Sequence, residues 1–480
     1  SGTLTRSSGE NVGNYNILLG SGASAGSKAS NYNITFDAGN QALSVSSRPI
    51  TINADSGQSK VYGDVDPTFT KSITAGSLAT FSGVADVLSG SLARDAGDDV
   101  GSSYAINQGG LTNANNPNYN ITYVPANFEI TQRAITLAAT ASTKIYGNSD
   151  PILAVTVTSG SLATIGGTQD SLSSVSGSLT RSSGENVGSY NILLGEGSAA
   201  SNYNITYASS NSAFIITRRP ISVAAVSGQS KVYGDIDPDF NYSAQAQTTV
   251  AGLVAGDVLV GSLSRASGES VGSTYAITQG GLTNSNNQNY NISFTSANFE
   301  ITKKAITLTA SAATKVYGES DPSLAVTVTS GSLAAIGGTQ DSLSSVSGTL
   351  TRSSGENVGN YNILLGSGSA AANYDISFNS SNQAFAVTPA TLTATGGKVY
   401  DGLITISGSD LVVNGVSGQT FTASGLATMG TKNVQTNQIL ADVLGISLAG
   451  NSGALTSNYL PLDVSNTSVS VTPKSVSLVA

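Results

Sequence analysis

Hydrophobic and polar residues alternate with a period of two along most of the chain. In one such stretch the polar Asn204 and Thr206 separate Tyr203, Ile205 and Tyr207. Successive side chains of a β-strand point to opposite faces of a sheet, so this alternation predicts strands with one buried face. Turn-forming residues interrupt the pattern about every eight to twelve residues, a spacing typical of β-sandwiches and small barrels.

Other stretches add strands but little helix. Tyr190, Ile192 and Leu194 recur at every second position after a glycine-rich turn, and they predict a second strand in the same repeat. No helical stripe of apolar residues is sustained. We expect at most a short helix, around residues 86–88 or 170–172.

Three motifs recur in a fixed order at intervals of 83 to 88 residues. The first, Lys-(Val/Ile)-Tyr-Gly, begins at Lys60, Lys144, Lys231 and Lys315, with a variant at Lys398. An Asp-Pro pair follows its first four copies, at Asp66, Asp150, Asp237 and Asp321. The second, Arg-x-x-Gly-(Glu/Asp)-x-Val-Gly, begins at Arg6, Arg94, Arg181, Arg265 and Arg352. The third, Asn-Tyr-(Asn/Asp)-Ile, contains Tyr32, Tyr119, Tyr203, Tyr290 and Tyr374. This order predicts a tandem array of small modules.

The repeat also has a period of two modules. Lys60 and Lys231 lie 171 residues apart, and the sequence matches better at that distance than between neighbouring copies. Residues 1–20 have the same sequence as residues 347–366. We interpret this pattern as the recent duplication of a two-module unit.

Module boundaries fall where an outgoing strand meets an incoming strand without a Gly/Ser linker. The division is 1–48 (C-terminal part of a repeat), 49–133 (module 1), 134–219 (module 2), 220–304 (module 3), 305–389 (module 4), 390–473 (module 5) and 474–480 (first strand of a following repeat). We therefore expect an all-β array of about 85-residue β-sandwich or β-grasp-like modules, part of a longer protein. Such tight junctions indicate an elongated rod of modules arranged end to end.

Composition and charge narrow the range of functions. Charged residues make up 10% of the chain and the net charge is −9, so the basic face that nucleic acids require is missing. No apolar run is long enough to insert into a membrane. The chain has no His and no Cys, which removes the common general base and the thiol nucleophile. We expect no enzyme activity, no catalytic residue, no metal site and no cofactor.

The repeated charged residues have a structural and a functional interpretation. In the structural one, the Lys motif delivers Tyr to the core, Gly makes the turn, and Lys pairs with Asp across it. A covalent isopeptide bond from this Lys is an alternative. The Arg-x-x-Gly-Glu motif predicts a surface ion pair, with sugar recognition as the alternative.

Calcium binding is a further alternative for the acidic residues, because Ca²⁺ requires several converging carboxylates. The candidates are Asp64, Asp66, Asp95, Asp98, Asp99, Asp235 and Asp237. Sister copies do not keep all these acids, since Asn148 replaces Asp64 and Ala266 replaces Asp95. Glycosylation sequons occur at Asn33, Asn120, Asn204 and Asn291, where the alternation already requires polar residues.

Together the three motifs resemble the MBG-type repeats of large secreted bacterial adhesins. Residues 390–473, with Lys398-Val399-Tyr400-Asp401-Gly402, resemble the related YDG-type repeat. Proteins with such arrays resemble filamentous-haemagglutinin-like exoproteins, often exported by two-partner secretion. The resemblance implies an extracellular location, secreted or at the bacterial cell surface, and a role in attachment, aggregation or biofilm formation.

Three functions stay open at this point. The first is a structural stalk that extends an adhesive region from the cell. The second is a set of weak sites for extracellular polysaccharide or host glycan that act by avidity, which would need a tyrosine exposed in every copy. The third is a fibre in which copies of the chain pair laterally through strand edges.

Overall fold

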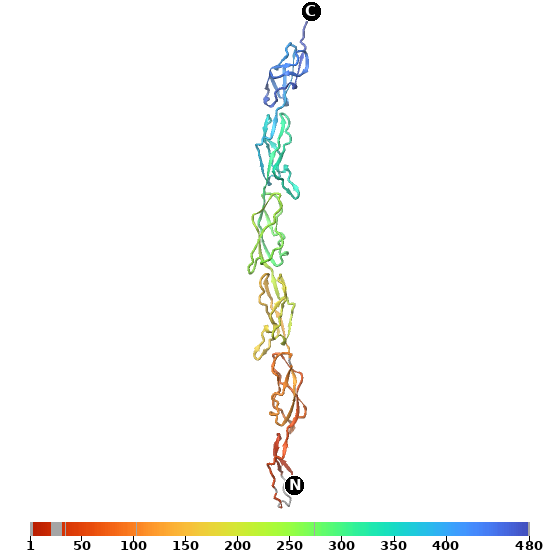
Figure 1. The fold of residues 1–480 in the computed structure, drawn as a ribbon, viewed down its shortest axis with the longest axis vertical. Helices are drawn as coiled ribbons and strands as arrows, with labels where there is room; N and C mark the ends of the chain where they lie inside the picture. Colours follow the sequence, from red (N-terminus) through yellow and green to blue (C-terminus); the bar gives the residue numbers. More distant parts are fainter. Residues whose placement is uncertain (1–2, 21–30, 34, 102, 273, 479–480) are drawn as a thin grey trace. The chain divides into compact units, whose positions relative to one another are not determined.

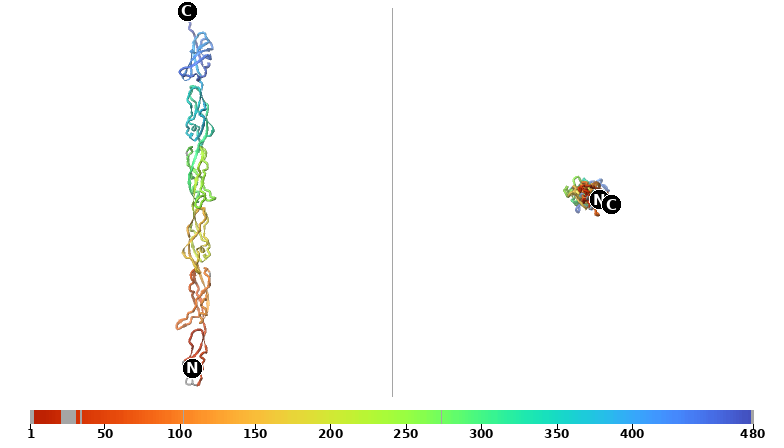
Figure 2. Two further views of the ribbon diagram at one scale, coloured as in Figure 1. Left: turned by 90° about the vertical axis from the view of Figure 1, so that its left-hand side faces the viewer. Right: turned by 90° about the horizontal axis from the view of Figure 1, so that it is seen from below.

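The computed structural model describes residues 3–20, 31–33, 35–101, 103–272 and 274–478 (Figures 1 and 2). The chain divides into two compact units. Residues 1–220, 247–254 and 288–291 form unit 1, and residues 221–246, 255–287 and 292–480 form unit 2. Ile34, the last residue of the first Asn-Tyr-Asn-Ile motif, lies outside the described residues.

Module 1, in unit 1, consists of two small sheets. The first has the order β12-β5-β7 and the second the order β10-β11-β13-β6, while β8 and β9 form a short hairpin. The strands are β5 Arg48–Ala54, β6 Gln58–Val61, β7 Lys71–Ala75, β8 Thr80–Phe81, β9 Val84–Ala85, β10 Ala93–Arg94, β11 Ser103–Asn107, β12 Tyr119–Val124 and β13 Ala126–Thr131. Both sheets turn apolar side chains inward, which corresponds to the sandwich alternative.

The opening and closing segments of module 1 run side by side in the same direction. β5 pairs in parallel with β12, from Arg48 opposite Tyr119 to Asn53 opposite Val124. β6 pairs in parallel with β13. Only Pro125 separates β12 from β13, so the chain passes from one sheet to the other at this proline, which cannot donate a ladder hydrogen bond.

Module 2 keeps this frame and changes the middle. Its sheets have the orders β16-β14-β22 and β15-β23-β20. Its elements are β14 Arg133–Ala139, β15 Ser142–Ile145, β16 Val155–Gly160, β17 Thr164–Ile165, β18 Thr168–Gln169, α1 Leu172–Ser176, β19 Thr180–Arg181, β20 Gly188–Tyr190, β21 Ile192–Leu193, η2 Ala200–Asn202, β22 Tyr203–Tyr207 and β23 Phe214–Thr217. The partial repeat before module 1 contains β1 Leu4–Arg6, β2 Gly13–Tyr15, β3 Ile17–Leu19 and β4 Leu43–Val45.

The remaining elements repeat the two patterns and then diverge. Module 3, which contributes residues to both units, has β24 Arg219–Ala225, β25 Gln229–Val232, β26 Tyr242–Ala244, β27 Ser264–Arg265, β28 Thr274–Thr278, β29 Tyr290–Thr295 and β30 Asn298–Thr302. Module 4, in unit 2, has β31 Lys304–Ala310, β32 Ala313–Val316, β33 Val326–Gly331, β34 Ala335–Ile336, β35 Thr339–Gln340, α2 Leu343–Ser347, β36 Thr351–Arg352, β37 Gly359–Tyr361, β38 Ile363–Leu364, η3 Ala371–Asn373, β39 Tyr374–Phe378 and β40 Phe385–Thr388.

Module 5, also in unit 2, forms a larger sheet of eight strands. Its elements are β41 Thr393–Val399, β42 Thr405–Ser407, η4 Gly408–Asp410, β43 Leu411–Asn414, η5 Val416–Gly418, β44 Thr420–Met429, β45 Gln435–Gln438, β46 Leu440–Asp442, β47 Ile446–Gly450, η6 Thr456–Asn458, η7 Val464–Asn466 and β48 Thr467–Thr472. The first and last strands, β41 and β48, again pair in parallel.

The cores of modules 1 and 2 are continuous. One cluster of buried side chains includes Ile106 and Phe128 of module 1 and extends to Val175 and Tyr203 of module 2. Ile192, Phe214 and Ile216 form a separate, smaller cluster at the other end of module 2. Contact between neighbouring modules therefore buries apolar surface, as expected for small domains in an array.

The all-β prediction is confirmed, with two local corrections. Tyr203 is buried and Asn204 exposed, as the alternation predicts. A helix forms near Asp170, as α1, but residues 86–88 are not helical. The strand predicted through Tyr190 and Ile192 is two strands, because β20 pairs with β23 while β21 pairs with β19. The rod shape stays a prediction.

Candidate functional site

Four charged side chains meet at one end of module 2. Lys144 Nζ lies 2.6 Å from Asp150 Oδ1 and 2.5 Å from Glu185 Oε2. Arg181 Nε lies 2.6 Å from Asp150 Oδ2, and its guanidinium also contacts Glu185. We call these four residues the charge cluster. Each cation contacts both anions, so the charges balance within the cluster.

Both cations of the charge cluster are buried while its acids are partly exposed. The side chain of Lys144 is 4% exposed and that of Arg181 is 8% exposed. The guanidinium of Arg181 lies 5.1 Å from the ring centre of Tyr190 and 5.0 Å from that of Phe214. Cation–π contacts of this kind are strongest where water is excluded. The predicted pair of Arg181 with Glu185 forms, and Glu185 is 65% exposed, but the arginine side chain is largely covered by the two rings.

The charge cluster shifts the pKa values of its acids downward. The hydrogen bond from Arg181, followed by that from Lys144, lowers the pKa of Asp150, although burial opposes the shift. In module 4 the equivalent bonds from Arg352 and Lys315 lower the pKa of Asp321 to about 2. Burial alone would lower the pKa of Lys144, but its bonds to the two acids raise it. An ionised lysine beside ionised carboxylates disfavours the isopeptide alternative, which needs a neutral amine.

The charge cluster is repeated in each full module up to module 4. Its members are Lys60, Asp66, Arg94 and Asp98 in module 1; Lys231, Asp237, Arg265 and Glu269 in module 3; and Lys315, Asp321, Arg352 and Glu356 in module 4. Module 5 keeps only the lysine pair, with Lys398 Nζ 2.8 Å from Asp401 Oδ1. The predicted Lys–Asp pair across the turn is thus confirmed.

The acids considered for calcium binding point to cations and amides instead. Asp66 and Asp98 both contact Lys60, and Asp64 contacts Arg133. Asp95 accepts a hydrogen bond from an asparagine amide, as does Asp99. Among the described residues no group of three acidic side chains is placed to hold a metal ion. In the same part of the chain no helix has the length and apolar character needed to cross a bilayer.

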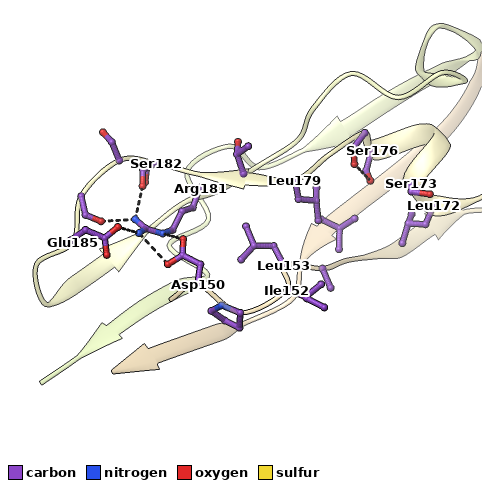
Figure 3. A pocket seen from close by; sticks show the side chains of 17 residues that line it. Asp150, Ile152, Leu153, Leu172, Ser173, Ser176, Leu179, Arg181, Ser182 and Glu185 are labelled. Carbon is purple, nitrogen blue, oxygen red and sulfur yellow. Dashed lines mark hydrogen bonds and ion pairs between the residues drawn. The ribbon is translucent and has the colours of Figure 1, made fainter. Parts of the chain in front are cut away.

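A groove of about 910 Å³ opens beside the charge cluster of module 2 (Figure 3). Arg181, Asp150 and Glu185 lie at one end, Ile152, Leu153 and Leu179 along the middle, and Leu172 with Ser173 and Ser176 at the other end. Ile152 is 96% exposed. The matching region of module 4, where Ser323 takes the place of Ile152, holds two smaller hollows of about 580 and 390 Å³. No aromatic side chain lines the groove of module 2.

The junction between modules 1 and 2 is built around two tyrosines. The rings of Tyr62 and Tyr203 meet edge to face, with centres 5.5 Å apart. Both phenols donate to Asp170 Oδ2, from 3.2 and 2.6 Å. Burial, together with the hydrogen bond to Asp170, raises the pKa of Tyr203 to about 12. The Lys motif therefore delivers its tyrosine to the junction with the next module. The sequence instead predicts that this tyrosine lies in the core of its own module.

A glycine makes this close approach possible. Gly63 follows Tyr62 with φ of +79°, and a Cβ there would lie 2.5 Å from Cβ of Ala163. A side chain at this position would be strained by its backbone and would push the two modules apart. Gly234 meets Ala334 in the same way at the junction of modules 3 and 4.

Cations at the module boundaries complete the junctions. Arg133 donates to the carbonyl of Tyr62 at 2.9 Å and to Asp64 at 2.8 Å. Arg219 is fully buried and donates to the carbonyls of Tyr146 and Gly252 at 2.9 Å. Sequence reasoning used these residues only to mark boundaries and missed their role. The signal was the repeated cation itself, at Arg48, Arg133, Arg219 and Lys304.

Further contacts recur at the junctions. A carboxylate receives both tyrosines at two of them: Asp170 between modules 1 and 2, and Asp341 between modules 3 and 4. Two asparagine side chains meet across the boundary at three others. These pairs are Asn118 with Asn11 at 2.9 Å, Asn289 with Asn186 at 2.9 Å and Asn458 with Asn357 at 2.8 Å.

Tyrosine exposure bears on the glycan alternative. All 19 tyrosines lie in the described residues, and Tyr32 alone is exposed, at 72%. Its counterparts in the later copies are buried, at 2–4% exposure: Tyr119, Tyr203, Tyr290 and Tyr374. The sequon residues Asn120, Asn204 and Asn291 are exposed on their strands. A tyrosine shelf repeated in every copy is therefore not present.

Comparison with known proteins agrees with this geometry. A family model described as MBG domain (YGX type) matches four tandem segments, residues 50–129, 135–212, 221–300 and 306–393. These segments together cover more than half of the chain. No curated protein matches it. The likeness of residues 390–473 to a YDG-type repeat stays a prediction.

Proposed function

This chain belongs to the family of MBG domains of the YGX type, and we propose that its repeats form the structural stalk of a bacterial adhesin. Tandem MBG repeats are typical of bacterial surface proteins. In this proposal the array is extracellular, secreted or held at the cell surface, and it extends an adhesive region for attachment, aggregation or biofilm formation. The repeats themselves carry no reaction.

One observation carries the proposal: neighbouring modules are joined by specific contacts with almost no linker. A single residue, Gln132, separates β13 from β14. Tyr62, Arg133 and Asp170 then tie the two modules together through hydrogen bonds. A flexible string of domains would instead be linked by Gly- or Ser-rich segments with few contacts. Built junctions of this kind favour a stiff array.

The other two functions have less support. Repeated glycan sites would need a tyrosine exposed in every copy, whereas the repeated tyrosines lie in the module cores and at the junctions. Lateral pairing is compatible with edge strands such as β16, which contains no charged residue between Val155 and Gly160. Charged edge residues normally discourage such pairing, and Lys71 on β7 is one. The first experiment therefore has to separate the stalk from the fibre.

Small-angle scattering of the 480-residue chain over a concentration series tests the proposal. We expect a thin particle whose maximum dimension does not change with concentration. Growth of bundles with concentration would make self-association the function, and a compact particle would contradict the stalk.

A junction variant sharpens this measurement. We expect Tyr62→Ala to shorten the mean maximum dimension, because it removes the ring contact and the phenol at one junction. Tyr32→Ala, which truncates an exposed tyrosine, is the matched control and should leave the dimension unchanged. An unchanged dimension in Tyr62→Ala would mean that this junction does not hold the modules in line.

A display experiment tests the reach of the array. The chain would be placed between an outer-membrane anchor and a lectin, and residues 134–304 deleted as one two-module unit. We expect lectin-dependent attachment through a thick capsule to fall in the shortened form, while attachment of uncapsulated cells is kept. Equal attachment of both forms would argue against a spacer role.

A further inference from the structure

We infer that each module is a mechanical clamp, loaded in shear when its two ends are pulled apart. The inference deepens the proposed function, since a stalk under flow is pulled at its ends. It rests on strand order and register within single modules. The clamp is the pair of parallel ladders that joins the opening segment of a module to its closing segment.

Module 1 shows the arrangement most fully. Its opening segment, β5 followed by β6, lies in parallel beside its closing segment, β12 followed by β13. The first ladder has six residue pairs, from Arg48 opposite Tyr119 to Asn53 opposite Val124. The second has four, from Gln58 opposite Phe128 to Val61 opposite Thr131. Force therefore enters at one end of the double ladder and leaves at the other.

Parallel terminal strands decide how force reaches the hydrogen bonds. Pulling residue 48 and residue 131 in opposite directions slides one segment along the other, so the ladder bonds are loaded together. Pulling two neighbouring strands from the same end would load one bond at a time. The hydrogen bonds are individually weak, worth about 1 kcal/mol each in water. When the bonds share the load, the barrier to unfolding is higher, and the rate of forced unfolding is lower.

The exit end of the ladder is reinforced in the same way along the chain. In module 1 the amide of Tyr62 donates to the carbonyl of Thr131 at 2.9 Å, and the Thr131 hydroxyl donates to the carbonyl of Lys60 at 3.2 Å. Equivalent bonds join Tyr146, Lys144 and Thr217; Tyr317, Lys315 and Thr388; and Tyr400, Lys398 and Thr472. The lysine of this strand also belongs to the charge cluster, so that cluster fixes β6 to the loop before β11.

The parallel ladders recur in other modules. In module 2, β14 pairs with β22 and β15 with β23. In module 4, β31 pairs with β39 and β32 with β40. In module 5, β41 pairs with β48 over six residue pairs. The divergent module 5 changes its charge cluster and its sheet, yet it keeps the parallel pairing of its terminal strands.

Single-molecule pulling with optical tweezers tests the clamp on the full chain. The sequence has no cysteine, so paired cysteines introduced at the surface give unique handle sites. In one variant, Ser46→Cys with Gln132→Cys, the handles lie at the two ends of the double ladder and load it in shear. In the matched variant, Ser46→Cys with Pro117→Cys, both handles lie at the Arg48–Tyr119 end and peel β5 from β12.

We expect module 1 to open at a several-fold higher mean force in the shear variant than in the peeling variant at the same loading rate. Hydrogen-exchange protection of β13 should be equal in both variants, which shows that stability is matched. Equal forces, or a lower force in shear, would overturn the inference. The display experiment tests the stalk separately: a strong clamp with unaltered attachment would contradict only the stalk, and a weak clamp with length-dependent attachment would contradict only the clamp.

Discussion

Modules 1 and 2 share one frame but fill it differently. Both have parallel terminal ladders, a charge cluster and a tyrosine that points to the next module. In module 1, Phe69 packs edge to face on Phe128, with ring centres 5.3 Å apart. In module 2 the matching residue is Leu153, beside Phe214, and the groove opens over it. Leu111, fully buried in module 1, has no counterpart in the shorter loop of module 2.

The difference shows that the contacts holding the modules together are independent of the residues that fill each module's interior. The charge cluster and the junction tyrosine keep their geometry whether the interior is closed by Phe69 or left open at Leu153. Module 2 inserts α1 instead, and Val175 on this helix joins the cluster of buried side chains shared with module 1. The terminal ladders, charge cluster and junction tyrosine therefore tolerate different interior residues. The same type of substitution can be made in both modules and its effects compared.

The largest effect is expected from removing the central phenylalanine. Phe128→Ala should reduce the free energy of unfolding of module 1 by about 3–5 kcal/mol, because it leaves a cavity in a closed core. Phe214→Ala should cost module 2 less, since its neighbour Leu153 lines the groove and can move into the space that the ring leaves. Hydrogen exchange resolved by module in the full chain measures both. A larger loss in module 2 would contradict the comparison.

The next effect concerns the buried lysine of the charge cluster. Lys144→Met keeps the apolar stem but leaves two carboxylates with one cation, and it should cost about 1.5–3 kcal/mol. Lys60→Met should cost less, because Lys60 is 3.3 Å from Asp98 whereas Lys144 is 2.5 Å from Glu185. Thermal unfolding followed by module-resolved exchange gives both values. Equal losses would show that the second acid contributes little.

Acid should weaken the charge cluster within a defined range. The folded pKa of Asp321 is about 2, below its ordinary value of 3.8, because Arg352 and Lys315 donate to it. A depressed folded pKa stabilises the fold above the ordinary value, and this stabilisation is lost as the pH falls from about 4 towards 2. We expect exchange protection of module 4 to fall over that range. In Asp321→Asn the fall should be smaller, and an identical fall would assign the effect to other acids.

The smallest effect is expected from exchanging the filling residues. Phe69→Leu should destabilise module 1 by about 1 kcal/mol, and Leu153→Phe should change module 2 by less than about 1 kcal/mol, because its ring can lie in the groove. Differential scanning calorimetry with module-resolved exchange is sensitive enough for both. A marked destabilisation by Leu153→Phe would show that the groove does not accept a ring.

The sequence predicts local features well and distant partners poorly. Alternation along 203–207 gives the strand and its buried face, and the fixed spacing of Lys60 and Asp66 gives their pair. The junction partner of Tyr62 is Tyr203, more than a hundred residues away, and no local pattern connects them. The sequence predicts an exposed side chain for Arg181, because the rings that cover it belong to other strands. Only the contrast between Phe69 and Leu153 in aligned copies could have pointed to the groove.

The repeated junction aspartate has a consequence for how such arrays are inherited. Asp170 and Asp341 receive a tyrosine from the preceding module, and an aspartate stands at the matching position of modules 1 and 3, as Asp86 and Asp257. A single module lost or gained by unequal recombination among modules 1 to 4 would therefore still place an aspartate at the new junction. Gain of a pair explains the 171-residue period, but the junction aspartate does not require it. Lineages carrying this gene would then differ in array length by single modules as well as by pairs.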